Sequence, residues 1–262
     1  MPRFRTLAAV VTLGVVLMLG GRALANHDAD VTTDELKCQS AVAGIQGKLV
    51  AAASTCSTKC QQGARAAKNP LSDCTSPFGG AMLACINKAV GKALSDEPKK
   101  CAKDCPECYA GGDCTADAAS RTATTQTQLN AFGPLIYCDD SGSGDGLTAG
   151  EGKCMDGISK GLSKMVGALG KCSAKCKAGE HKGTIPVGAC DPPATDAATA
   201  ACLSTVVTKT NAGIDKVCSA VSEVPECQAI TTGAAWTTTV TTVLNASYLT
   251  TYCGSASAAF ID

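Results

Sequence analysis

Eighteen cysteines are the side chains with the widest range of chemistry in this 262-residue sequence. Cysteine can ligate zinc or iron–sulfur clusters, attach haem, exchange disulfides or crosslink the chain. Haem attachment requires Cys-x-x-Cys-His, whereas the one Cys-x-x-Cys, Cys105-Pro-Glu-Cys108, is followed by Tyr109. The sequence therefore excludes a c-type cytochrome.

The amino terminus indicates the redox compartment of these cysteines. Residues 1–25 are typical of a secretory signal peptide, with Arg3 and Arg5, an apolar stretch from Leu7 to Leu19, and a small-residue cleavage site at 23–25. The uncharged run is too short to span a bilayer. We expect a secreted or periplasmic protein with no transmembrane span after cleavage, and an even cysteine count then predicts up to nine disulfides.

Metal binding competes with this disulfide formation. Cys101, Cys105 and Cys108 match the Cys-x3-Cys-x2-Cys spacing of iron–sulfur radical enzymes, but an oxidising compartment does not suit that cluster. The two histidines, His27 and His181, have no carboxylate or histidine neighbour at metal-ligand spacing. We expect no metal and no cofactor, and we expect both histidines to be exposed.

Two further motifs have chemical interpretations that we weigh against simpler ones. Gly157-Ile158-Ser159-Lys160-Gly161 has the Gly-x-Ser-x-Gly form of a hydrolase nucleophile elbow, yet it lies within a predicted helix. Residues 139–146 alternate acidic or hydroxyl residues with glycine, as in a calcium loop, but Glu151 falls one place late for an EF-hand. We expect no catalytic residues, and a solvated linker over 139–150.

A stripe of lysines is the surface pattern most open to a binding role. The five lysines recur at intervals of 7, 4, 7 and 4 residues, which places them on one side of a helix; they are Lys153, Lys160, Lys164, Lys171 and Lys175. The stripe is either a solvated face that limits aggregation or a surface that binds an anionic glycan, the cell envelope or a partner protein. Loss of the signal leaves 20 basic and 23 acidic residues, so nucleic acid is not an expected partner.

The cysteine spacing predicts an internal duplication. The intervals from Cys38 to Cys101 are 18, 4, 14, 11 and 16 residues, and those from Cys154 to Cys218 are 18, 4, 14, 12 and 16. We expect a first cysteine-rich repeat over 26–138 and a second over 151–262. Cys105 and Cys114 are additional to the first repeat.

The apolar periodicity predicts an all-α protein with about three helices in each repeat. Eighteen residues complete five helical turns, so Cys38 and Cys56 share a face with Val42, Ile45 and Leu49, as their counterparts do in the second repeat. The second helix follows from Leu83, Ile86, Val90 and Leu94. The third segment is rich in Thr, which favours strands, but its apolar spacing favours a helix.

Antiparallel helical hairpins then constrain the disulfides, because nested bridges fit both ends of a hairpin. This geometry predicts the pairs Cys38–Cys101, Cys56–Cys85, Cys60–Cys74, Cys105–Cys114, Cys154–Cys218, Cys172–Cys202 and Cys176–Cys190. Elimination leaves Cys108–Cys138 and Cys227–Cys253. A straight third helix would hold these last cysteines too far apart, so either that segment folds back or these two pairings are wrong.

These observations favour a non-catalytic structural or binding protein that acts on an unidentified protein or glycan at the cell envelope or outside the cell. The alternative is an extracellular enzyme, a hydrolase or a thiol–disulfide oxidoreductase, with a site between the repeats. A deep pocket between the repeats, lined by acidic or hydroxyl groups and containing a strongly perturbed pKa, would indicate the enzyme.

Overall fold

All regular structure in the described residues is helical. The computed structural model describes residues 31–138, 148–219, 228 and 230–253. In chain order the elements are α1 (Thr33–Arg65), the short 3-10 helix η1 (Leu71–Cys74), α2 (Gly80–Lys100), α3 (Cys114–Tyr137), α4 (Ala149–His181), α5 (Ala197–Ser219) and α6 (Gly233–Thr251). The all-α prediction is confirmed, and it holds for the Thr-rich segments that form α3 and α6.

Some sequence-based expectations fall outside this part of the chain. The predicted signal peptide over 1–25, His27 and residues 139–147 of the predicted linker are not among the described residues. The rest of the linker contains Thr148, the N-cap of α4. No helix among the described residues is long and apolar enough to cross a membrane.

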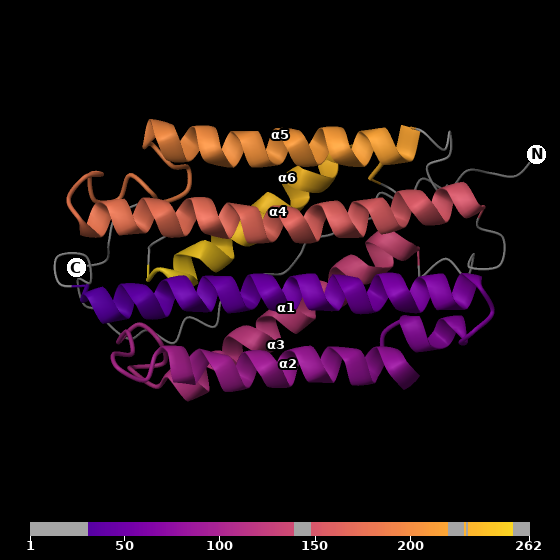
Figure 1. Cartoon of the computed structure of the whole chain (residues 1–262), viewed down its shortest axis with the longest axis horizontal. Helices are drawn as coiled ribbons and strands as arrows, with labels where there is room; N and C mark the ends of the chain where they lie inside the picture. Colours follow the sequence, from indigo (N-terminus) through magenta and orange to yellow (C-terminus); the bar gives the residue numbers. More distant parts are fainter. Residues whose placement is uncertain (1–30, 139–147, 220–227, 229, 254–262) are drawn as a thin grey trace, which may run out of the picture.

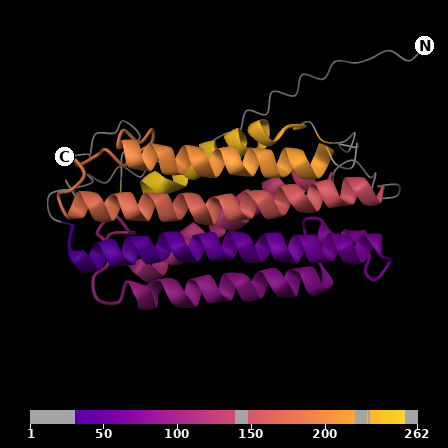
Figure 2. The same cartoon turned by 45° about the horizontal axis from the view of Figure 1, so that its top comes forward.

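Four helices form one layer, in the order α2, α1, α4, α5, and two helices cross behind it (Figure 1). The view in Figure 2 shows the same layer, with α3 behind α1 and α2 and α6 behind α4 and α5. Helix α1 contacts both α2 and α4, and α4 contacts α5. We call residues 31–138 the first half and residues 148–253 the second half.

Helices α1 and α4 begin in the same way. Thr32 accepts a hydrogen bond from the Glu35 backbone at 3.0 Å, and the Glu35 carboxylate accepts one from the Thr32 backbone at 2.8 Å. Thr148 and Glu151 form the equivalent capping box at 3.1 and 2.7 Å. These reciprocal bonds satisfy amide groups that have no partner inside a helix and fix where each 33-residue helix starts.

The predicted inner faces of α1 and α4 are buried. Cys38, Val42, Ile45 and Leu49 of α1 are each at most 8% exposed, as are Cys154, Ile158 and Met165 of α4. The predicted face of α2 is wrong in part, because Leu83 and Leu94 are 43% and 38% exposed. The buried residues of α2 are Met82, Ile86, Ala93 and Glu97. The helix is therefore rotated relative to the predicted face, with Met82 and Ala93 pointing inward in place of Leu83 and Leu94.

Disulfides join the ends of each hairpin. In the first half, Cys38–Cys101 and Cys56–Cys85 connect α1 and α2 with Cα separations of 4.6 and 5.9 Å. In the second half, Cys154–Cys218 and Cys172–Cys202 connect α4 and α5 at 4.5 and 6.0 Å. The remaining bridges that match the predicted pairs are Cys60–Cys74, Cys176–Cys190 and Cys105–Cys114.

The predicted pairs Cys108–Cys138 and Cys227–Cys253 are wrong, because Cys108 is bonded to Cys253. Helix α3 is continuous over 24 residues, so it carries the chain about 36 Å away from Cys108 before reaching Cys138. Helix α6 instead ends beside the loop between α2 and α3, where the Tyr109 hydroxyl donates to the Thr251 carbonyl at 2.5 Å. The Cys108–Cys253 bridge therefore ties the first half to the second.

We expect non-reducing peptide mapping to recover a peptide from around Cys108 linked to the carboxy-terminal peptide containing Cys253. The physical reason is that α6 returns its last turn to the α2–α3 loop. The bridge Cys56–Cys85, which lies within one hairpin, serves as the positive control in the same digest. Recovery of Cys108 linked to Cys138 would contradict the arrangement of α3 and α6.

Candidate functional site

An apolar cavity of about 100 Å³ lies between the two halves. Helices α1, α3, α4 and α6 form its walls, and Phe78 and Ile86 close one side. Its lining is mainly aliphatic and aromatic, with hydroxyl and amide groups as its polar part. The lining residues include Val50, Ala53, Ser54, Thr125, Leu129, Phe132, Tyr137, Ser159, Leu162, Ser163, Val166, Val240, Val243 and Leu244.

Small side chains on α1 and α4 leave room for this cavity. At the crossing of the two helices, a Cβ added to Gly47 would lie 3.6 Å from the Gly167 Cα, so the backbones approach closely there. Farther along the contact, Ala53 and Ser54 of α1 face Ser159 and the lining residues of α4. Alanine and serine fill less volume than the leucines that usually occupy such positions. Side chains of α3 and α6 line the space that remains.

Hydroxyl groups form the polar part of the cavity wall. The Ser54 and Ser159 hydroxyls are 2.8 Å apart, and the Ser54 hydroxyl also donates to the Ser159 carbonyl at 3.1 Å. The Tyr137 hydroxyl lies 2.9 Å from the Thr58 hydroxyl. Burial raises the pKa of Tyr137 to about 12, against the opposing effect of its hydrogen bonds to Ser159 and Thr58. The phenol is therefore un-ionised at neutral pH.

The Gly-x-Ser-x-Gly motif lies inside helix α4, as the sequence analysis expects. Ser159 is 4% exposed and its hydroxyl is bonded to Ser54. A nucleophilic serine needs a base within hydrogen-bond reach, and no histidine, carboxylate or lysine is among the residues that line the cavity. The buried contact between Ser159 and Ser54 is therefore explained by the packing of α4 against α1.

The predicted lysine stripe lies on the outer side of α4. Lys153, Lys160, Lys164, Lys171 and Lys175 are all exposed, and none of the five has an ion pair within the described residues. They follow one another over about 33 Å of helix. His181, at the last position of α4, is also exposed, and its Nε2 lies 3.1 Å from the Thr33 hydroxyl of α1.

The first half contains a buried carboxyl group that the sequence did not predict. Glu97 of α2 is 1% exposed, and one carboxyl oxygen accepts a hydrogen bond from the Gln46 amide. The Gln46 carbonyl in turn accepts from the Thr125 hydroxyl at 2.7 Å, and Thr125 lines the cavity. The network therefore runs from the interior of the first half to the cavity wall.

Burial dominates the acid–base properties of Glu97. The pKa of this carboxyl is raised to about 7 by desolvation, against the opposing effects of the Gln46 hydrogen bond and the Arg121 charge. Asp117, which pairs with Arg121, raises it further. The second carboxyl oxygen, Oε2, has no hydrogen-bond partner among the described residues. The signal available in the sequence was the position of Glu97, three residues after Leu94 and in line with the predicted apolar face of the second helix.

A second buried polar cluster stabilises the loop after α4. Lys177 lies 2.7 Å from the Glu180 carboxylate and 3.0 Å from that of Asp191, and all three are at most 9% exposed. The other Glu180 oxygen accepts from the Cys190 backbone at 2.8 Å. One ammonium is shared by two carboxylates, and Glu180 holds the Cys176–Cys190 loop through the Cys190 backbone, so we assign this cluster a structural role.

Comparisons with protein families, curated proteins and solved structures found no match to this chain.

We expect Glu97→Gln to remove a pH dependence of stability. A carboxyl whose folded pKa is above its unfolded value contributes stability at low pH, and this contribution is lost as pH rises from about 4.5 to about 7. Above pH 7, the variant should be more stable than the parent by about 3 kcal/mol, from 1.36 kcal/mol per pKa unit. Urea unfolding from pH 5 to 8 measures this difference.

Asp96→Asn is the matched control for this measurement, because the Lys92 ammonium beside Asp96 lowers the pKa of that carboxyl, so it stays ionised from pH 5 to 8. The pH dependence of its unfolding free energy should follow that of the parent across this range. An identical pH dependence in the parent and in Glu97→Gln would show that Glu97 ionises without cost in the folded protein.

Proposed function

We propose that the chain is an exported, non-catalytic binding protein, built from two copies of a three-helix unit, that holds a small apolar molecule or the end of an apolar chain between the copies. The observation that carries this proposal is the cavity of about 100 Å³ with its apolar lining. Export is supported by the signal peptide predicted over residues 1–25 and by disulfides in both halves, which suit an oxidising compartment.

The duplication is supported by matching features at matching places. Each of three bridges in the first half has nearly the same sequence separation as its counterpart in the second half: 63 against 64 residues, 29 against 30, and 14 against 14. Helices α1 and α4 are both 33 residues long and run antiparallel, because Thr33 contacts His181, Ser54 contacts Ser159 and Gln62 contacts Asp156. Two copies related by an approximate twofold axis would make such a contact.

The cavity lies where that axis would pass. Its lining contains several pairs of residues that occupy equivalent positions when the cysteines of the two halves are aligned. These pairs are Val50 and Val166, Thr125 and Val240, Gln128 and Val243, and Leu129 and Leu244. A site lined by both copies exists only when the two copies are associated. The duplication would thus be needed to form the binding site.

The chemistry of the lining favours binding over catalysis. Apart from Tyr137, whose phenol is un-ionised at neutral pH, none of the lining side chains titrates. Cavities of about 150 Å³ with apolar walls stay dry and bind benzene-sized molecules, so the present cavity suits a group of a few carbon atoms. The Ser54 and Ser159 hydroxyls can accommodate one polar atom of such a ligand.

We expect the folded protein to bind 1-octanol, and we expect Ser163→Leu to weaken this binding at least about tenfold, or ~1.4 kcal/mol. Ser163 lines the cavity and its hydroxyl donates only to the carbonyl of Lys160 in its own helix, so leucine would fill the cavity without breaking a contact between helices. Isothermal titration calorimetry gives the two dissociation constants.

Ser204→Leu makes the same change on the exposed face of α5, away from the cavity, and should bind 1-octanol as the parent does. Equal loss of binding in both variants would indicate that 1-octanol adsorbs to the protein surface and does not occupy the cavity. An absence of binding by the parent protein would refute an apolar ligand of this size.

A second role, binding of an anionic polymer along α4, is supported by the exposure of all five lysines of the stripe and by the lack of ion pairs there within the described residues. A linear polyanion can follow the stripe because its charges are spaced along one helix. This role is independent of the cavity.

We expect the triple variant of Lys160, Lys164 and Lys171 to alanine to elute from heparin at lower salt than the parent, because three charges of one stripe are lost. The matched control removes Lys88, Lys99 and Lys100, which are exposed on α2 or at its end. Equal shifts for the two variants would indicate a response to net charge alone.

A further inference from the structure

Three disulfides gather at one end of the molecule, where the start of α1, the loop between α2 and α3, and the end of α6 meet. The cluster surrounds the buried Tyr109, whose hydroxyl is bonded to α6. Its members are Cys38–Cys101, Cys105–Cys114 and Cys108–Cys253. The aligned segment of the second half has no counterpart of Cys105 or Cys114.

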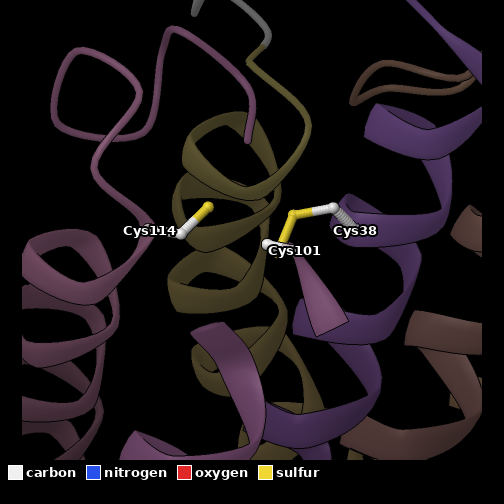
Figure 3. Close-up of side chains that lie close together, drawn as sticks. All are labelled: Cys38, Cys101 and Cys114. Atoms are coloured by element: carbon white, nitrogen blue, oxygen red, sulfur yellow. A yellow bond between two sulfur atoms is a disulfide. The ribbon is translucent and has the colours of Figure 1, made fainter. Parts of the chain in front are cut away.

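One sulfur of the Cys105–Cys114 bridge lies beside both sulfurs of the Cys38–Cys101 bridge. The Sγ atoms of Cys38, Cys101 and Cys114 all lie within 4.8 Å of one another. Figure 3 shows the Cys114 side chain pointing toward the Cys38–Cys101 bridge. Three thiolates at such distances would be a metal site, but each of these sulfurs is bonded in a disulfide, so the arrangement favours sulfur exchange.

The two bridges differ in accessibility. Cys105, in the loop between α2 and α3, and Cys114, the first residue of α3, are half-buried, whereas Cys38 and Cys101 are 0% and 3% exposed. A soluble reductant can therefore reach the Cys105–Cys114 bridge but not the Cys38–Cys101 bridge directly. Thiol–disulfide exchange requires access and a thiolate in contact with the target sulfur.

We propose that this cluster is a thiol–disulfide exchange site that passes reduction from the more accessible Cys105–Cys114 bridge to the buried Cys38–Cys101 bridge. An external dithiol reduces Cys105–Cys114, supplying two electrons and becoming a disulfide itself. The Cys114 thiolate then attacks one sulfur of Cys38–Cys101. A bond forms between Cys114 and that sulfur, the Cys38–Cys101 bond breaks, and the other cysteine leaves as a thiolate that takes a proton from solvent.

The consequence of this exchange is mechanical. The Cys38–Cys101 bridge closes one end of the α1–α2 hairpin, and after exchange the first residue of α3 is tied to that end instead. The redox state of the surroundings would then control which helices are joined at this end. This proposal does not depend on the ligand proposed for the cavity.

The second half contains an internal control. Cys154–Cys218 joins α4 and α5 at a Cα separation of 4.5 Å, against 4.6 Å for Cys38–Cys101, and its cysteines are 0% and 7% exposed. No bridge like Cys105–Cys114 lies beside Cys154–Cys218 among the described residues. The opening rate of Cys154–Cys218 therefore shows how fast a buried bridge of this kind is reduced when no neighbouring cysteine can attack it.

Two single variants test the exchange without any reductant. Cys105→Ser leaves the Cys114 thiol in the cluster, whereas Cys114→Ser removes it, and both lose the same bridge. After alkylation with N-ethylmaleimide and peptide mapping, we expect Cys105→Ser to carry label on Cys38 or Cys101, with Cys114 linked to the other. We expect Cys114→Ser to carry label on Cys105 alone. Label on Cys114 alone, on Cys108 or on Cys253 in Cys105→Ser overturns the proposal.

The wild-type chain provides a second measurement in case a variant folds poorly. Under limiting dithiothreitol, Cys38–Cys101 should open at least about tenfold faster than Cys154–Cys218, because an intramolecular thiolate acts at a high effective concentration. Removal of both Cys105 and Cys114 should bring the two rates together. Equal rates in the wild-type protein refute the exchange.

Discussion

Each antiparallel hairpin of this protein is closed by a disulfide at both ends, and the rest of the structure depends on this constraint. Aromatic residues make up 3% of the sequence, so the large side chains that usually anchor a core are scarce. Between the bridges, the contacts come from Val, Leu, Ile, Met and Ala. A single bridge contributes about 2 to 4 kcal/mol, mainly by restricting the unfolded chain. The crosslinks therefore allow long helices with small side chains to remain aligned.

The two halves share this frame but differ in their interiors. Where the first half has Gln46, Glu97, Arg121 and Thr125, alignment of the cysteines places Leu162, Ile214, Trp236 and Val240 in the second half. Trp236 and Ile214 are buried in an apolar cluster, whereas Glu97 has an unpartnered carboxyl oxygen. The second half has its own buried ions in Lys177, Glu180 and Asp191. Identical crosslinks thus support two different cores, because the bridges reduce the demand for apolar burial in each.

The parts of the fold that follow from local geometry were predictable from the sequence. The pairs within a hairpin follow from the spacing of cysteines along helices, and the buried face of α1 follows from the 18-residue interval between Cys38 and Cys56. The partner of Cys108 was not predictable in this way, since it depends on the path of α6 back to the α2–α3 loop. The rotation of α2 was not predictable from its apolar spacing, because Leu83 and Leu94 lie on the outer side of the helix while Met82 and Ala93 face inward.

The cavity was not predictable from the sequence for a related reason, since its walls come from four helices whose crossing only the tertiary structure specifies. An unfilled volume of about 100 Å³ costs roughly 2.4 kcal/mol at about 24 cal/mol per Å³, which is comparable to the contribution of one disulfide. In most cores, neighbouring helices relax toward such a space and reduce it. Here α1 is held to α2 and α4 to α5 by bridges at both ends, and α1 and α4 already approach closely at Gly47 and Gly167. The bridges hold each hairpin in shape and the contact at Gly47 and Gly167 limits how closely α1 and α4 approach, so the same crosslinks that replace an aromatic core also help to keep the proposed ligand site open.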